Sequence, residues 1–295
     1  MNRANRTLIL LLLAGCASLA GANERFKTPD AAAEAFVAAL GTDEADAERL
    51  AALLGDDWQD YIPTQGIERK DVDAFISHYK EKHSIDSAKG RAHIVVGNDP
   101  WTLPIPIVQD KDGWRFDAKA AAEEIRLRRI GRNELAAIEA AEAYHDAQMD
   151  YAEVDRNGNG LLEYAQKLIS SDGQHDGLYW PDEDGTDESP LGPLFGGQAQ
   201  GDDWHGYHFR ILTAQGPSAP GGAYDYLLGK AMSRGFALVA WPARYGDSGV
   251  MSFMISHEGQ LFQKDLGPDS ETLAKAMKTF DPDSSWDEVK AQDEP

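Results

Sequence analysis

The stretch AKAAAEEIRLRRIGRNELAAIEAAEAYHDAQMDY, from Ala118 to Tyr151, decides the fold of this chain. It contains no proline and a single glycine, Gly131, so nothing in it ends a helix early. Apolar or small residues recur every seven positions, at Ile130, Ala137, Tyr144 and Tyr151. This spacing produces one mildly apolar face and one charged face. The stretch therefore predicts one long helix, which needs another layer to cover its apolar face.

The residues that follow supply this layer. Strands rich in β-branched and aromatic residues are predicted at residues 206–214, 235–241, 249–256 and 260–265. A tight turn at residues 257–259 joins the last two strands, which indicates an antiparallel sheet. We predict a domain over residues 118–280, a long helix packed on an antiparallel sheet, followed by a disordered acidic tail at residues 281–295.

In the first part of the chain, helical patterns come before strand patterns. Thr28 is placed to cap the first helix, and Pro29 stands in its first turn. Helices are predicted at residues 28–40, 45–54 and 70–83, and strands at residues 91–97, 103–108 and 113–117. This order predicts a small α+β domain over residues 26–117, and the α+β class for the whole chain. Through that order and the strand Gly-Trp-Arg-Phe-Asp, the domain resembles the cone-shaped cystatin and nuclear-transport-factor folds.

Residues 1–22 have the pattern of an export signal. Arg3 and Arg6 precede the apolar run LILLLL, which is too short to span a bilayer. Two cleavage sites remain open. The favoured one is the lipobox Leu13-Ala14-Gly15-Cys16, which would place a lipid anchor on Cys16; the other is a small-x-small site ending at Ala22. The sequence thus predicts an exported protein, either soluble in the periplasm or anchored as a lipoprotein, with the outer membrane favoured.

The composition narrows the functional classes. The chain has 50 acidic and 28 basic side chains among 295 residues, a formal charge of −22. Such a charge repels nucleic acid, and basic residues cluster only at residues 126–132. One apolar run excludes a protein that spans the membrane several times, and one cysteine excludes an internal disulfide. We expect no nucleic-acid partner, and contact with a membrane only through a lipid at Cys16. The sequence leaves open a partner protein in the cell envelope.

Four motifs carry a family resemblance: RIGRNEL at 129–135, EYAQ at 163–166, GFALVAWP at 235–242 and QKDLG at 263–267. On these motifs the chain resembles a bacterial exported domain-of-unknown-function family, the one numbered 2950. Its later part is similar to pseudopilins, through a long helix, a variable loop and a sheet with a pattern running from Ala240 to Phe253. The resemblance implies a fold and a compartment but no activity. Because the long helix is internal, a pilus subunit is not expected.

The loop that follows the long helix is the best candidate for a metal site. Oxygen-bearing side chains stand at positions one, three and five of an EF-hand-like loop, with glycine at position six. The candidate calcium ligands are Asp155, Asn157, Asn159, Leu161 through its carbonyl, and Glu163. Position twelve is Gln166 instead of a bidentate glutamate, which weakens the pattern. A plain turn between two elements remains the alternative, and calcium is the only cofactor that the sequence suggests.

Other chemical motifs are weaker. Ser248 lies in a Gly-Asp-Ser-Gly motif that lacks the histidine segment of a protease, and His205 and His208 stand three apart at the start of a strand, which points their rings to opposite faces. Tryptophans near glycine or proline can line a groove, although core packing is their usual role; they are Trp101, Trp114, Trp180, Trp204 and Trp241. No catalytic residue is assigned. The expected function is a non-catalytic binding or assembly module; the alternative is a hydrolase or glycan-acting enzyme whose carboxylates meet only in the folded chain.

Overall fold

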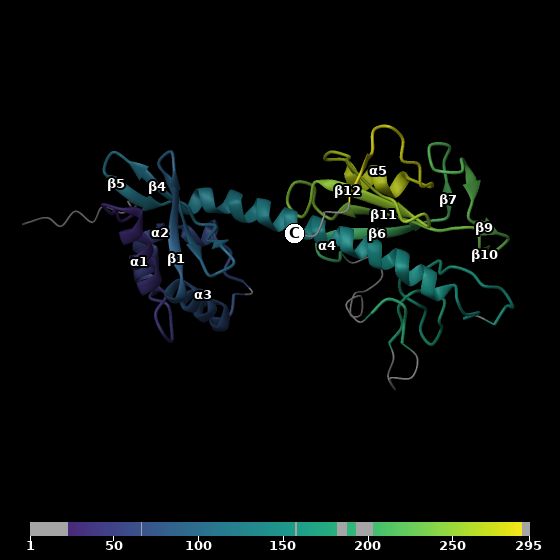
Figure 1. The fold of residues 1–295 in the computed structure, drawn as a ribbon, viewed down its shortest axis with the longest axis horizontal. Helices are drawn as coiled ribbons and strands as arrows, with labels where there is room; N and C mark the ends of the chain where they lie inside the picture. Colours follow the sequence, from purple (N-terminus) through teal and green to yellow (C-terminus); the bar gives the residue numbers. More distant parts are fainter. Residues whose placement is uncertain (1–22, 66, 157, 182–187, 193–202, 291–295) are drawn as a thin grey trace, which may run out of the picture. The chain divides into compact units, whose positions relative to one another are not determined.

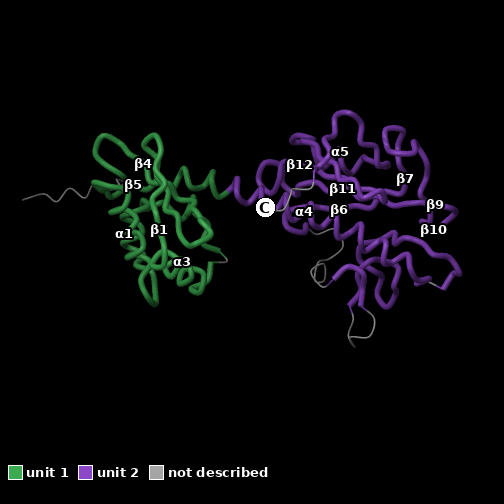
Figure 2. Tube along the Cα trace, in the orientation of Figure 1, with its two compact units in different colours: residues 1–125 green, residues 126–295 purple. Residues whose placement is uncertain are grey.

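A computed structural model describes residues 23–65, 67–156, 158–181, 188–192 and 203–290. The export signal predicted for residues 1–22, with Cys16, lies outside these residues. The chain divides into two compact units, residues 1–125 and residues 126–295 (Figure 2). Each unit has a hydrophobic core of its own.

The first unit combines short helices with an antiparallel sheet. Its helices are α1 (Pro29–Ala39), α2 (Ala47–Leu54), the 3-10 turn η1 (Trp58–Asp60) and α3 (Arg69–Glu81). Its strands are β1 (His83–Ala88), β2 (Arg91–Val96), β3 (Trp101–Thr102), β4 (Ile107–Asp110) and β5 (Gly113–Phe116). The strand order is β1-β2-β4-β5, and β3 pairs with β2. The α+β class predicted from the sequence is confirmed.

Side-chain caps set the starts of these helices. The Thr28 hydroxyl accepts a hydrogen bond from the Ala31 amide at 3.2 Å, and an Asp46 carboxylate oxygen accepts one from the Arg49 amide at 2.9 Å. Each cap satisfies an amide that the first helical turn leaves without a partner. At α3, Glu68 and Asp71 form a reciprocal capping box. The helix starts predicted from the sequence, at residues 28, 45 and 70, lie within two residues of the starts in the structure.

The helices cover the buried face of the sheet (Figure 1). Ala92, Ile107 and Phe116 form one cross-strand row, because Ala92 pairs with Ile107 and Ile107 pairs with Phe116. All three side chains are fully buried, and they share a core with apolar residues of α1 and α2. The register thus points one face of the sheet at the helices.

Strand β1 was not predicted from the sequence, which placed the third helix up to His83. The helix ends at Glu81, and Lys82 is already extended. Within β1 only Ile85 is partly buried, and the other residues are exposed. An edge strand with so little burial lacks the apolar alternation that identifies a strand, so its pairing with β2 is visible only in the structure.

Helix α4 (Ala118–Tyr151) contains 34 residues and confirms the long helix predicted from the sequence. It begins in the first unit, where Ala118 and Ala121 join the first core. It continues in the second unit, where Ala137 and Tyr144 join the second core. The boundary between the compact units therefore lies within α4, after residue 125, and not at residue 118.

The second unit is built on a five-stranded antiparallel sheet of order β14-β13-β12-β11-β6. Its strands are β6 (Tyr207–Leu212), β11 (Ala237–Pro242), β12 (Met251–Ser256), β13 (Leu261–Asp265) and β14 (Asp287–Glu288). The shorter strands β7 (Ala214–Gln215) and β8 (Tyr224–Asp225) pair with each other, as do β9 (Leu227–Leu228) and β10 (Ala231–Met232). The four strands predicted in this part of the chain are thus confirmed.

Two helices pack on this sheet (Figure 1). The Tyr144 hydroxyl of α4 donates a hydrogen bond to the Ala237 carbonyl at 3.2 Å. Helix α5 (Ser270–Ala276) packs on β11, and the Arg210 guanidinium of β6 donates to its last carbonyls, those of Ala274 and Met277. In this way the guanidinium caps the C-terminus of α5, where the free carbonyl groups favour a cation.

The predicted disordered tail is wrong for residues 281–290. Strand β14 pairs with β13, and the Val289 amide donates to the Leu261 carbonyl at 2.9 Å. Trp286 is only 9% exposed and belongs to the core of the second unit. The disorder was predicted from the acidic composition of the segment, which gave no weight to two apolar residues. Trp286 and Val289 pack against the core and hold the segment at the edge of the sheet. Residues 291–295 lie outside the described residues.

Candidate functional site

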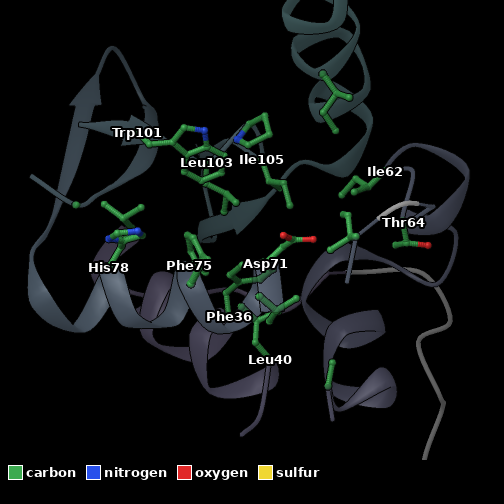
Figure 3. A pocket seen from close by; sticks show the side chains of 18 of the residues that line it. Phe36, Leu40, Ile62, Thr64, Asp71, Phe75, His78, Trp101, Leu103 and Ile105 are labelled. Atoms are coloured by element: carbon green, nitrogen blue, oxygen red, sulfur yellow. The ribbon is translucent and has the colours of Figure 1, made fainter. Parts of the chain in front are cut away.

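The candidate site is a pocket in the first unit. It has a volume of about 930 Å³ and lies between α3 and the segment that runs from Trp101 to Ile105 (Figure 3). Its floor reaches the hydrophobic core, where Phe36, Leu54 and Val96 line it. This volume falls within the range of pockets that hold small molecules.

One wall of the pocket is a single side of α3. Asp71, Ala74, Phe75, His78 and Glu81 line the pocket, and they follow one another at intervals of one or three residues along the helix. Spacings of three and four residues place side chains on one side of a helix. In Figure 3, Asp71, Phe75 and His78 lie along α3, facing the residues of the opposite wall. The capping box at Glu68 and Asp71 sets where this wall begins.

The opposite wall follows β3. Trp101, Leu103 and Ile105 lie along it (Figure 3), and Leu103 and Ile105 are buried. Trp101 is 48% exposed, and its ring meets that of Phe75 edge to face, with the centroids 6.1 Å apart. Ile67, which is 54% exposed, lines the pocket as well. The mouth of the pocket therefore presents two large apolar side chains to solvent, which a bound ligand would cover.

The charged lining is entirely acidic among the described residues. Asp71, Glu81 and Asp99 line the pocket, and His78 is the only basic side chain among the described lining residues. The Asp71 carboxylate accepts a hydrogen bond from the Glu68 amide at 2.8 Å, and the Glu81 carboxylate accepts one from the Asn98 amide group at 2.7 Å. The pocket thus combines apolar walls with carboxylates at its surface.

Sequence reasoning identified only part of this pocket. It predicted the helix that carries one wall, at residues 70–83, and named Trp101 among the tryptophans that can line a groove. Trp101 does line the pocket, whereas Trp180 and Trp241 are 4% exposed and belong to the core of the second unit. The sequence offered only a tryptophan directly after a proline; the two-residue strand β3 that carries Trp101 is seen only in the structure.

The predicted calcium loop folds as a compact turn after α4. The Asp155 carboxylate accepts hydrogen bonds from the Asn159 amide at 3.1 Å and the Gly160 amide at 2.8 Å. The Asn159 side-chain oxygen accepts one from the Leu161 amide at 2.8 Å. Asn157 lies outside the described residues. Asp155 and Asn159 are thus brought into one loop, and the Leu161 side chain points to solvent, 52% exposed.

Glu163 and Gln166, later in the same loop, have partners in the protein. Glu163 is only 9% exposed, and its carboxylate accepts a hydrogen bond from the Asn159 side-chain amide at 2.9 Å. The Gln166 side chain donates to the Lys230 carbonyl at 2.7 Å. These bonds account for the loop as a turn, and calcium binding stays a prediction. No group of three or more His, Cys, Asp or Glu side chains is placed to hold a metal ion in the described part of the chain.

Ser248 and the histidine pair have structural surroundings. The Ser248 hydroxyl accepts a hydrogen bond from the Arg244 amide at 2.9 Å and donates to the Arg244 carbonyl at 3.2 Å, so it closes the loop between β11 and β12. His205 lies in the turn before β6 with a φ of 48°, and His208 lies within β6, beside Trp241. The strand begins after His205, so the two rings belong to different local structures.

The carboxyl groups with shifted pKa values are held ionised. For Asp247, the hydrogen bond from Arg244 and the charge of Arg129 lower the pKa, against an opposing contribution from burial. For Asp176, burial raises the pKa, but the bonds from Lys167 and Ser171 outweigh it, and the net shift is downward. A catalytic acid needs a shift in the opposite direction. These carboxylates therefore stabilise the fold as ion-pair and hydrogen-bond partners.

Comparison with known proteins adds a family. A family model described as "Protein of unknown function (DUF2950)" matches residues 23–289. No curated protein and no solved structure matches the chain. In the described residues, none of the helices combines the length and the apolar character needed to cross a membrane.

Proposed function

The chain belongs to the DUF2950 family of proteins of unknown function, and we propose that it is a non-catalytic binding protein. Its N-terminal unit holds a small ligand with an apolar body in the pocket between α3 and β3. The observation that carries the proposal is this pocket itself, about 930 Å³ in volume and open to a floor of core side chains.

The apolar walls supply the affinity. Each square ångström of apolar surface removed from water contributes about 25 cal/mol. A ligand in the pocket would cover Trp101 and Ile67, which are 48% and 54% exposed without it. Leu103 and Ile105 are buried and belong to the core, so the wall behind the ligand is already packed. A largely preformed wall lowers the entropy that binding costs.

The polar groups of the pocket support binding more than catalysis. The Asp71 carboxylate is engaged in the capping box of α3, and Glu81 is engaged with Asn98. A pair of catalytic carboxyl groups requires environments that move their pKa values apart. Both carboxylates of the pocket instead accept hydrogen bonds from donors within the protein, the Glu68 amide and the Asn98 side chain. A hydrolase or glycan-acting enzyme, the alternative from the sequence, has no comparable support.

We place this binding protein in the cell envelope as part of the same proposal. The support is the pattern of residues 1–22, with a lipobox that ends at Cys16, and the family resemblance to exported proteins. Changing Cys16 to Ala should move the protein from the membrane fraction to the soluble fraction after cell fractionation. If the unchanged protein is already soluble, the prediction of a lipid anchor is wrong and cleavage at the site ending at Ala22 takes its place.

The later part of the chain, which resembles pseudopilins, would serve as an assembly surface for a partner.

The uncharged fluorophore N-phenyl-1-naphthylamine tests the pocket. Its fluorescence should rise on binding and saturate at one equivalent per chain. Ala74 is exposed and lines the pocket, so Ala74→Phe should fill the pocket and weaken binding by about tenfold or more while leaving the fold intact. Ala52→Phe is the matched control, because Ala52 is also exposed on a helix but does not line the pocket. Equal affinities of the two variants would refute the proposal.

A further inference from the structure

One end of the pocket gathers negative charge at the C-terminus of α3. Glu81 is the last residue of α3, and Asp99 lies in the turn between β2 and β3; both line the pocket. The final carbonyls of a helix carry a partial negative charge that favours cations nearby. The two carboxylates and the C-terminus of α3 therefore all make the electrostatic potential at this end of the pocket more negative.

Hydrogen bonds hold the two carboxylates at the same end. The Asn98 side-chain amide donates to the Glu81 carboxylate at 2.7 Å, and the Gly97 amide donates to the Lys82 carbonyl at 2.9 Å. These bonds tie the turn that carries Asp99 to the end of α3. The placement of Glu81 and Asp99 is thus part of the fold of the first unit.

Aromatic rings lie at the same end. Trp101 lies two residues after Asp99 in the sequence, and it is 48% exposed. The Phe75 ring meets it edge to face at 6.1 Å, with an angle of 73° between the ring planes. The face of an aromatic ring attracts a cation, and quaternary ammonium groups are bound in this way. The His78 ring also lines this end (Figure 3).

The described lining holds no Lys or Arg that would balance an acidic ligand, and His78 is its only basic side chain. Lys80 and Lys82 flank Glu81 in sequence but do not line the pocket. A carboxylate or phosphate head placed beside Glu81 and Asp99 would meet like charges, which costs affinity. A cationic head would meet opposite charges and aromatic faces.

We propose that the pocket selects an elongated organic cation, a molecule with an apolar body and an ammonium head that lies among Trp101, Glu81 and Asp99. This inference rests on the proposed function, since it names the ligand class of the same pocket. The apolar body lies against the walls formed by α3 and the segment after β3. The head remains near the mouth, where it keeps part of its hydration.

Three compounds with the same chain test this selectivity: dodecylammonium, dodecanol and dodecanoate. Their binding to the full-length protein is measured by calorimetry below the concentrations at which they form micelles. Dodecylammonium should bind about tenfold more tightly than dodecanol, and dodecanoate more weakly than dodecanol, because a partly exposed charge pair and a cation–aromatic contact each contribute modestly. The double variant Glu81→Gln, Asp99→Asn should bring the ratio of dodecylammonium to dodecanol affinities close to one.

Control variants separate the possible outcomes. Asp86→Asn removes a carboxylate from β1 that does not line the pocket, so it should leave the preference for dodecylammonium unchanged. If dodecanol and dodecylammonium bind equally well, and Ala74→Phe weakens both, the selection of cations is refuted while the apolar pocket stands. A preference that survives in the double variant refutes it as well. If none of the three compounds binds, the proposed function and this inference both fail.

Discussion

Asp247 connects α4 with the loop between β11 and β12. Its carboxylate accepts a hydrogen bond from Arg244 at 2.8 Å and pairs with the Arg129 guanidinium of α4. Arg126 of α4 donates to the Gly246 carbonyl in the same loop, and Asn133 donates to the Ser248 carbonyl at 2.8 Å. The arginine cluster that the sequence set apart as the only basic one is therefore used in part to hold this loop.

The contribution of Asp247 to stability should depend on pH. Its pKa is lowered in the folded state by the Arg244 hydrogen bond and by Arg129. A carboxyl group with a lowered folded pKa stabilises the protein above its unfolded pKa, about 3.9, and loses that contribution as the pH falls through the folded value. Asp247→Asn should lower the free energy of unfolding at pH 7 by about 1 kcal/mol or less, since the side chain is 39% exposed and solvent screens the pair.

Chemical denaturation at several pH values checks this dependence. The difference between the parent protein and Asp247→Asn should shrink as the pH falls below about 4. Glu139→Gln, on an exposed position of α4, is the matched control and should differ little from the parent at any pH. A difference that stays constant from pH 7 to pH 3 would show that Asp247 acts without its charge.

Two polar side chains of α4 that lie next to its apolar face have partners that the sequence does not reveal. Glu134 and Gln148 lie one helical turn after Ile130 and Tyr144 of the predicted apolar face, and both bind backbone groups. Glu134 accepts hydrogen bonds from the amides of Val250 and Met251 at 2.9 and 3.0 Å. Gln148 is fully buried and both accepts from and donates to the backbone of Ala165. Sequence periodicity located the stripe but could not identify these partners.

At the scale of elements, β14 shows how a short strand is held at the edge of a sheet. It contains two residues, and it pairs with β13 through Phe262 and Gln263. Trp286 precedes it, buried against the core, with the Lys264 ammonium 5.8 Å from its ring centroid. Such a short pairing depends on the packing of its anchor more than on its hydrogen bonds.

Trp286→Ala should therefore destabilise the second unit and release β14. We expect the free energy of unfolding to fall by about 3 kcal/mol, the usual cost of removing a large buried aromatic side chain. Hydrogen exchange should also show faster exchange at the Val289 amide, which donates to Leu261. Lys290→Ala, at an exposed position, should change stability by less than about 0.5 kcal/mol. Equal stability of the two variants would contradict the role of Trp286 as an anchor.

At the scale of the whole molecule, two separate cores stabilise the chain. Phe116 is fully buried in the core of the first unit, and Phe253 is 1% exposed in the core of the second. Units with cores of their own are expected to unfold in separate transitions. Calorimetry of the full chain should show two transitions, and Phe116→Ala should lower one of them by about 10 °C or more.

The counterpart variant provides the control for this prediction. Phe253→Ala should lower the other transition and leave the one sensitive to Phe116→Ala in place. Ligand binding to the pocket should raise only the transition of the first unit, because a ligand stabilises the folded state to which it binds. If both substitutions shift a single common transition, the two units unfold as one cooperative body and the prediction is wrong.

The sequence by itself determined those features that depend on neighbouring residues: the long helix, most helix starts, the four main strands of the second unit and the α+β class. Periodicity and capping are local, so they can be read along the chain. The edge strand β1 pairs with its neighbour β2 but lacks apolar alternation, and the order of residues 281–290 depends on burial against distant strands, so both were missed. Only the tertiary structure decided the pocket, because its lining extends from Phe36 to Ile125 across several elements. Whether Trp101 fills a core or lines an opening depends on which of those elements pack beside it, and no local pattern records that.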